Sequence, residues 1–314
     1  MIVWLYIGII MCMRVVQSVF SKKNASNLHK NAVCYVKYTM YYQAVAGVFA
    51  LGLFLVGFFS GELVGDIGAT ILYASISGIA LAITCICGVY NLCQGTMSLS
   101  SLFGTAGLIV PTVACIFMYG EFIDWYQWVA IAVFMVGAYL LACGSKKVYG
   151  KFSLKQFLIL FLSLALNGVT MLMQKMFGMN VVGGNVSLFS LISFASGVVS
   201  FAIILLILKL IKKPSKPSEQ QDNFVLFPAL KEQAKIPKKS YLYGLFLAIA
   251  VFLINQLATL STPLIEAVVL FAIINGGATI ISTVVGAIFY KEKITWTTIL
   301  GLVLGIGSLV LLKV

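Results

Sequence analysis

The sequence predicts an all-α membrane protein whose ten transmembrane helices form two inverted five-helix repeats. Three features predict this fold class: the composition, a series of long apolar runs and an internal repeat. Of the 314 residues, 61% are hydrophobic and 10% are charged, and the mean hydropathy is +1.06. A soluble domain is about half apolar and about one quarter charged. The excess apolar surface cannot be hidden in one core, so it must face lipid.

Ten apolar runs are long enough to be membrane spans, because a helix needs about 20 mostly apolar residues to cross a bilayer. Each run is continuous rather than alternating, which indicates helices rather than barrel strands. The first run lacks the basic start and the small-residue cleavage site of a secretory signal, so we expect it to be retained. In order, the runs cover residues 2–20, 38–59, 67–90, 96–118, 125–143, 154–174, 186–208, 241–260, 264–289 and 296–312.

Polar breaks separate the runs and divide the chain into two halves. Most breaks are short and rich in Gly, Ser and Asn, which are typical turn residues. A linker at residues 146–153 separates a first five-helix repeat, residues 1–145, from a second, residues 154–314. The second repeat contains a Lys- and Pro-rich loop at residues 209–240, which we expect on the surface.

Two parts of the chain resemble each other, which indicates an internal duplication. A shift of 171 residues places the segment Tyr119–Trp125 on Tyr290–Trp296, and four of these seven positions are identical. A shift of 153 residues places Lys22 on Lys175, and the longer loop in the second half accounts for the difference between the two shifts. Because each repeat has an odd number of spans, the repeats must be inverted in the membrane. Inverted repeats with a binding site at the midplane are typical of transporters.

Each repeat ends with a small polar turn that contains glutamate, followed by a final helix. The turns contain Gly120-Glu121 and Glu292. The last helix carries Gly301, Gly305 and Gly307. In these features the whole chain resembles the drug/metabolite transporter superfamily in its ten-helix EamA-like form. The resemblance implies alternating access, with two halves rocking around a central cavity, and it does not specify the substrate. Lys291 departs from the family pattern, which often has glycine there.

The distribution of lysine predicts the orientation of the chain. Arg14 is the only arginine among the 21 basic residues, and 18 lysines lie in or beside the loops that follow the first, fifth, seventh and ninth runs. Cytoplasmic loops are enriched in Lys and Arg, so we expect both termini outside. The family resemblance implies the opposite orientation, and we follow the lysines. The net charge of +12 then reflects membrane topology, and we expect no nucleic acid partner.

Arg14 is the clearest candidate for a binding residue within a span. A charge at a helix centre costs about 2.5–3.5 kcal/mol on insertion scales, so such a residue usually faces a cavity or a partner. One polar helix face consists of Arg14, Gln17 and Ser21, and the 153-residue shift places it on Asn167, Thr170 and Gln174. We expect both faces to line one cavity, where Arg14 binds an anionic ligand or Glu266. The alternative is that Arg14 extends to the membrane interface.

Other polar residues are further candidates for substrate binding or coupling. Glu266 is suited to coupling with protons or cations, but it also stands at the start of a helix, where a carboxylate is favoured by the helix dipole. Amides within or beside the runs are equally suited to hydrogen bonds between helices. These amides are Asn91, Gln94, Asn255, Gln256 and Asn275.

Small residues and a proline indicate how the helices pack. Gly301-x-x-x-Gly305 and Ser193-x-x-x-Gly197 suit close contacts between helices. Pro111 lies within the fourth run and predicts a kink there.

Cysteine and histidine usage argues against a metal site, a disulfide framework and an intramembrane enzyme. Nearly all of the seven cysteines lie in apolar runs, and His29 is the only histidine. We therefore expect no catalytic residues, no metal and no cofactor. The sequence also contains no nucleotide-binding loop of the G-x-x-x-x-G-K-[ST] type, so we do not expect ATP as the direct energy source.

These features predict a secondary active transporter in the cell membrane that moves a small metabolite or drug, with export as the expected direction. The expected partners are a small-molecule substrate and the lipid bilayer. Coupling to protons or ions stays open, as does the choice between a monomer and a homodimer. A non-transporting membrane scaffold and an intramembrane enzyme are the alternatives. A scaffold does not need paired polar faces, and an enzyme needs a nucleophile–base pair that the runs do not contain.

Overall fold

The computed structural model describes residues 2–27, 32–61, 65–94, 104, 106–120, 122, 124–149, 154–210, 236–291 and 295–311. Within these residues the chain forms ten helices and no strands, and each predicted apolar run overlaps one helix. The helices are α1 (Ile2–Asn27), α2 (Ala32–Phe59), α3 (Ile67–Gln94), α5 (Ile109–Tyr119), α6 (Trp125–Tyr149), α7 (Leu154–Asn180), α8 (Val186–Leu210), α9 (Lys238–Ser261), α10 (Ala267–Tyr290) and α11 (Trp296–Leu311).

Seven of the described helices have the length and apolar composition of membrane spans: α1, α2, α3, α7, α8, α9 and α10. The apolar stretches of α5, α6 and α11 are shorter. Many large apolar side chains are exposed on the outside of the bundle, among them Phe59, Phe117 and Leu206. Such a surface is stable where lipid replaces water. The chain is therefore an all-α, multi-pass membrane protein, as the composition predicts.

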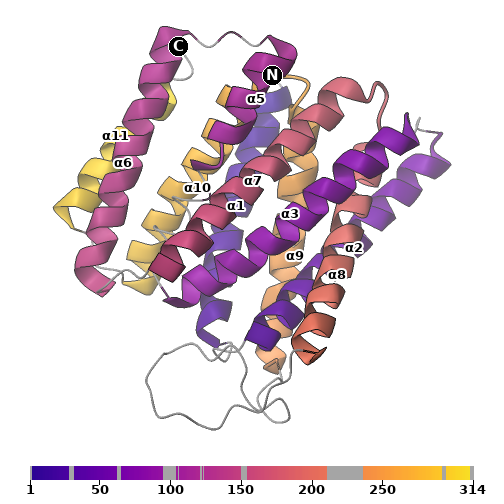
Figure 1. The fold of residues 1–314 in the computed structure, drawn as a ribbon, viewed down its shortest axis with the longest axis horizontal. Coiled ribbons are helices and arrows are strands. Elements are labelled where there is room, and N and C mark those ends of the chain that lie inside the picture. Colours follow the sequence, from indigo (N-terminus) through magenta and orange to yellow (C-terminus); the bar gives the residue numbers. More distant parts are fainter. Residues whose placement is uncertain are drawn as a thin grey trace.

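The most extensive helix packing joins the first half of the chain to the second. α2 lies against α8 and α6 lies against α11, and these two pairs form opposite sides of the molecule in Figure 1. Between them, α3 packs on α7 toward the viewer, and α1 packs on α9 behind. A large apolar cluster lies in this middle region and includes Ile10, Met171 and Phe271.

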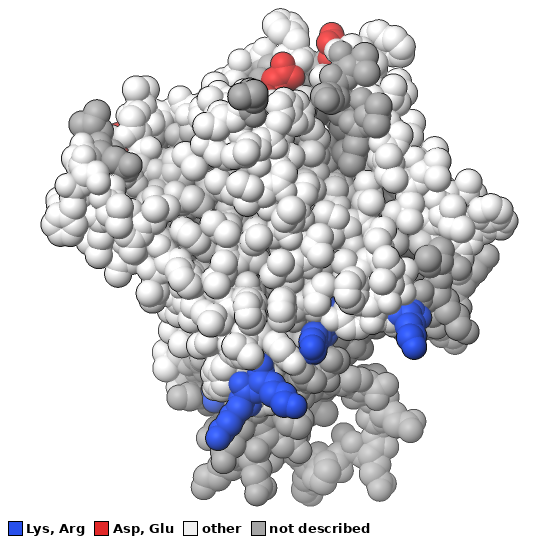
Figure 2. Space-filling model, turned by 180° about the vertical axis from the view of Figure 1, so that it is seen from behind, with Lys and Arg blue, Asp and Glu red and all other residues white. Residues whose placement is uncertain are grey.

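The two ends of the bundle carry opposite charge, as Figure 2 shows. The end where α1 stops and α9 starts carries Lys22, Lys23, Lys238 and Lys239, and we call it the lysine end. The described acidic residues precede helices that start at the other end, which we call the acidic end: Asp66 before α3, Asp124 before α6 and Glu266 before α10. Both chain termini lie at the acidic end (Figure 1).

Small residues allow backbones to approach closely at three helix contacts, two of which contain the predicted small-residue pairs. A Cβ atom on Gly78 of α3 would overlap the carbonyl oxygen of Ser193 on α8, which confirms the role of the Ser193–Gly197 pair. A Cβ on Gly137 of α6 would lie 2.9 Å from the carbonyl oxygen of Gly301 on α11, which confirms the second pair. A Cβ on Gly107, just before α5, would lie 2.7 Å from the carbonyl oxygen of Leu164 on α7.

Two helix ends that the predicted internal repeat would relate share one backbone conformation. Gly120 follows α5 with φ of 62°, and Lys291 follows α10 with φ of 52°; both are left-handed. Residues in this conformation end helices by bonding back to the last turn, and glycine is favoured there because it has no Cβ. Pro111 lies in the first turn of α5, where proline is tolerated, so the described residues show a helix start beside it and not the predicted kink.

Candidate functional site

A cavity of about 290 Å³ lies in the middle of the bundle, where six helices meet. Its walls come from α1, α2, α3, α7, α9 and α10, together with Gly104. The helices α5, α6, α8 and α11 contribute no described residue to this lining. This volume is near the lower limit for sites that hold small organic ligands, which span about 300–1,000 Å³.

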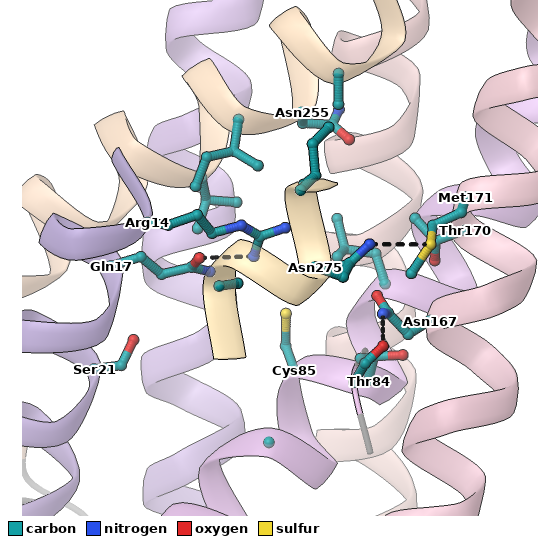
Figure 3. Close-up of a pocket in the computed structure, with 18 of the residues that line it drawn as sticks. Arg14, Gln17, Ser21, Thr84, Cys85, Asn167, Thr170, Met171, Asn255 and Asn275 are labelled. Atoms are coloured by element: carbon teal, nitrogen blue, oxygen red, sulfur yellow. Dashed lines mark hydrogen bonds between the residues drawn. The ribbon is translucent and has the colours of Figure 1, made fainter. Parts of the chain in front are cut away.

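One polar wall comes from α1, as the spacing of its polar residues predicts. Arg14, Gln17, Ser18 and Ser21 line the cavity. The Nη1 group of Arg14 donates a hydrogen bond of 2.9 Å to Oε1 of Gln17, which lies one turn further along the helix. Figure 3 shows both side chains reaching from α1 into the space between the helices. The Nε of Arg14 is buried and has no hydrogen-bond partner among the described residues.

The facing wall comes from α7, whose polar face contains the predicted residues and one more. Ser163, Asn167, Thr170 and Gln174 line the cavity at helical spacing. Asn167 Nδ2 donates a hydrogen bond of 2.6 Å to the carbonyl oxygen of Gly104, which holds α7 to the segment before α5. The Thr170 hydroxyl donates to the carbonyl oxygen of Leu166 in its own helix, at 3.1 Å.

Amides on α9 and α10 complete the polar surface. Gln174 Nε2 on α7 donates a hydrogen bond of 2.6 Å to Oδ1 of Asn255 on α9. Asn275 Nδ2 on α10 donates to the carbonyl oxygen of Phe271 at 3.0 Å and lies 3.4 Å from the sulfur of Met171. These bonds hold the amides in place and tie α7 to α9 and α10.

A chain of buried hydrogen bonds continues from Asn255 away from the cavity into α8. Asn255 Nδ2 lies 3.4 Å from the Ser190 hydroxyl, which donates to Gln256 Oε1 at 2.7 Å. Gln256 Nε2 in turn donates to the Ser187 hydroxyl at 3.0 Å. The chain joins α7, α8 and α9, all of which belong to the second half.

Besides Thr84, Cys85 and Ser282, most of the remaining lining is apolar, and its larger members are aromatic and aliphatic side chains. They are Tyr38, Tyr42, Leu81, Leu247, Val251, Ile254, Phe271 and Ile274. The sequence gives no signal that these residues line a cavity, because an aromatic or branched residue in an apolar run is equally suited to packing or to lipid contact. The spacing of Tyr38 and Tyr42, one helical turn apart, is the one signal that could have indicated a shared face.

The structure brings together seven of the eleven residues that the sequence analysis selected. Those that line the cavity are Arg14, Gln17, Asn167, Thr170, Gln174, Asn255 and Asn275. Gln256 is buried but bonds to serines of α8, because a neighbouring helical residue points about 100° away from Asn255. Glu266 is exposed and precedes α10 at the acidic end, so the structure does not bring it to Arg14. Asn91 and Gln94 fall within α3, which extends beyond the predicted residue 90, and their side chains lie outside the described part.

Arg14 is the one charged side chain among the described residues of the lining. Arg14 lies at the middle of α1 (Ile2–Asn27), and the other polar groups of the described lining are all neutral. The described residues contain no group of three or more His, Cys, Asp or Glu side chains that could hold a metal ion.

The cavity reaches close to the lysine end. Ser21 of the lining directly precedes Lys22, and Tyr38 directly follows Lys37. Toward the acidic end, the α7 lining stops at Gln174. The next residue, Lys175, is buried, and its Nζ donates to the carbonyl oxygens of Thr262 and Ile265 at 3.1 and 3.2 Å. These bonds tie α7 to the connection between α9 and α10.

Comparison with known proteins shows the fold of the chain and not its family. No protein-family model matches the sequence, and no curated protein does. Solved structures do resemble it, and 28 chains match. In one of them, a crystal structure of a protein with 11% sequence identity, the match covers 98% of this chain and 94% of that chain, with a TM-score of 0.66. At this identity the likeness concerns the fold alone.

Proposed function

We propose that this protein is a secondary active transporter that moves a small molecule across the cell membrane by alternating access. In this proposal ten helices cross the membrane as two inverted five-helix repeats, and the central cavity is the substrate site. The resemblance of the Glu121 and Glu292 turns to the EamA-like drug/metabolite transporters is part of its basis. The observation that carries the proposal is that lining positions on α1 and α3 are related by constant shifts in sequence to lining positions on α7 and α9.

The equivalence is clearest on α1 and α7. A shift of 153 residues relates four lining positions of α1 to four lining positions of α7. The α1 positions are Arg14, Gln17, Ser18 and Ser21, and the α7 positions are Asn167, Thr170, Met171 and Gln174. A similar relation holds for α3 and α9 with a shift of 170. The lining positions of α3 are Leu81, Thr84, Cys85 and Gly88. The corresponding positions of α9, which also line the cavity, are Val251, Ile254, Asn255 and Ala258. A site shared between inverted repeats is the architecture of many secondary transporters.

The helix pairing supports the same reading. If α1, α2, α3, α5 and α6 correspond in order to α7, α8, α9, α10 and α11, a two-fold axis exchanges the α1–α9 contact with the α7–α3 contact. It maps the α2–α8 and α6–α11 contacts onto themselves. All four are the most extensive contacts of these helices. A membrane scaffold has no need of a polar cavity on such an axis, and the lining offers no nucleophile–base pair for an enzyme.

Cysteine accessibility tests the proposal without knowledge of the substrate. Ser18 lines the cavity, and we suggest Ser18→Cys in a background from which the seven native cysteines have been removed. A membrane-impermeant methanethiosulfonate should label this cysteine both in intact cells and in inside-out vesicles, because alternating access opens the cavity to each side in turn.

Lys37→Cys provides the matched control, since Lys37 is exposed at the lysine end and should be labelled from one side only. Labelling of Ser18→Cys from a single side, or from neither, would show that the cavity does not alternate, and the scaffold would then be the better account.

A further inference from the structure

We propose that the cavity is selective for a small monoanion with an apolar body, and that Arg14 binds its carboxylate. The inference rests on the proposed transport function for its biological meaning, but it concerns binding and can be tested separately. It starts from the charge of the cavity, which comes from Arg14 alone among the described lining residues.

The guanidinium of Arg14 has one donor engaged and one buried donor without an acceptor among the described residues. Nη1 donates to Gln17, which orients the group, while Nε is buried without an acceptor among the described residues. A buried donor without an acceptor destabilises the empty site. The Nε and Nη2 groups point the same way and form the fork that binds a carboxylate through two parallel hydrogen bonds. A ligand carboxylate at this fork supplies the missing acceptor.

Charge balance decides between classes of ligand. A monoanion brings the net charge of the site to zero. A zwitterion leaves it positive, and a cation adds a second positive charge, while a phosphate monoester leaves a negative excess. In the low dielectric of a closed membrane cavity, an uncompensated charge is costly. The described acidic residues Asp66, Asp124 and Glu266 lie at the acidic end, and none of them lines the cavity to compensate a ligand ammonium.

The remaining walls define the body of the ligand. Tyr42, Phe271, Leu247 and Val251 present apolar surface, and the cavity of about 290 Å³ admits a small molecule only. A carboxylate joined to a short aliphatic or aromatic group satisfies both the fork and these walls.

Binding to the purified full-length protein tests the proposal with four compounds that share an unbranched six-carbon chain. They are hexanoate, norleucine, hexylamine and hexanol, which are an anion, a zwitterion, a cation and a neutral compound. Titration calorimetry should rank hexanoate first, with norleucine and hexanol about tenfold weaker or more and hexylamine without measurable binding. Equal or tighter binding of hexylamine, or no binding of hexanoate, would overturn the proposal.

Variants then assign the selectivity to Arg14. Arg14→Gln should weaken hexanoate binding about tenfold or more and leave hexanol unchanged. Arg14→Lys keeps the charge without the fork and should retain part of the affinity, which guards against a folding defect in the first variant. Lys239→Gln removes the same charge from an exposed position at the start of α9 and should bind hexanoate like the native protein. Unchanged affinity in Arg14→Gln would remove Arg14 from the site.

Failure of this proposal can be told from failure of the transport proposal. If Ser18→Cys is labelled from both sides while hexanoate does not bind, transport stands and the ligand class is wrong. If hexanoate binds through Arg14 while Ser18→Cys is labelled from one side only, the chain is an anion-binding membrane protein that does not alternate.

Discussion

Lys291 has a backbone conformation that costs an L-residue roughly 1–2 kcal/mol relative to the right-handed helix, with φ of 52°. Gly120, which the predicted repeat places at the equivalent helix end, takes the same conformation without that cost. The sequence analysis noted only that a lysine stands where a glycine is usual. The structure shows that the end of α10 has the left-handed geometry although lysine is unfavourable there.

Replacing Lys291 with glycine should therefore raise the stability of the protein by about 1 kcal/mol, because the strain is removed and the helix end is kept. Lys37→Gly is the matched control, since Lys37 lies inside α2 and glycine there should lower stability by about 0.8–1.0 kcal/mol. Reversible unfolding of both variants in mixed detergent micelles measures the difference. A loss of stability in Lys291→Gly would show that the lysine side chain contributes more than its backbone costs.

Single residues also show where sequence reasoning reached its limit in the candidate site. Five lining residues were predictable, because a polar residue in an apolar run usually faces a cavity or a partner and because their spacing places them on one face of each helix. They are Arg14, Gln17, Asn167, Thr170 and Gln174. Which of two adjacent amides faces the cavity was not predictable. Asn255 lines it and Gln256 does not, and only the rotation of α9 against α7 and α8 decides this.

At the scale of elements, the helices pack through small residues where they cross most closely. α3 and α8 meet at Gly78 and Ser193, and α6 and α11 meet at Gly137 and Gly301. Between helices in lipid, association depends on close packing and hydrogen bonds, because lipid tails are as apolar as the side chains. The sequence predicted the small-residue pairs on α8 and α11. It did not predict their partners, because glycine is frequent in all the apolar runs and carries no signal of what it faces.

Gly78→Ala should separate α3 from α8 and lower stability by about 1–3 kcal/mol, because the new methyl group would overlap the backbone of Ser193. Gly52→Ala, in the exposed part of α2, meets no atom within 4 Å and should be neutral or slightly stabilising. Thermal unfolding in detergent compares the two variants. If both behave alike, the α3–α8 contact is looser than the structure describes.

At the scale of the whole molecule, the two ends differ in charge as the lysine distribution predicts. Most of the described lysines gather at one end because the helices alternate in direction, so the pattern in the sequence becomes a surface in space (Figure 2). Ten apolar runs could be read from hydropathy alone. The packing between the two halves could not be predicted from hydropathy, because α3 packs on α7 and α1 packs on α9 through contacts between residues far apart in the sequence.

By the positive-inside rule, the lysine end should face the cytoplasm and both termini should lie outside. Cysteines placed at Lys216 and Lys235 should then resist a membrane-impermeant thiol reagent in intact cells and react in inside-out vesicles, and a tag at either terminus should be accessible from outside. Reaction of both cysteines in intact cells would mean that the chain is inserted the other way round, as the family resemblance implies.

The position of the cavity beside the lysine end has a kinetic consequence. Ser21 and Tyr38 of the lining are chain neighbours of Lys22 and Lys37, so an anion that approaches from this side enters a positive potential. From the acidic end the same anion is repelled. Capture should therefore be faster from the cytoplasm, and it should slow with added salt on that side, because the Debye length falls to about 10 Å at about 0.1 M. Such a difference cannot change the equilibrium between the two compartments, but in the proposed transporter it would make loading faster in the direction of export.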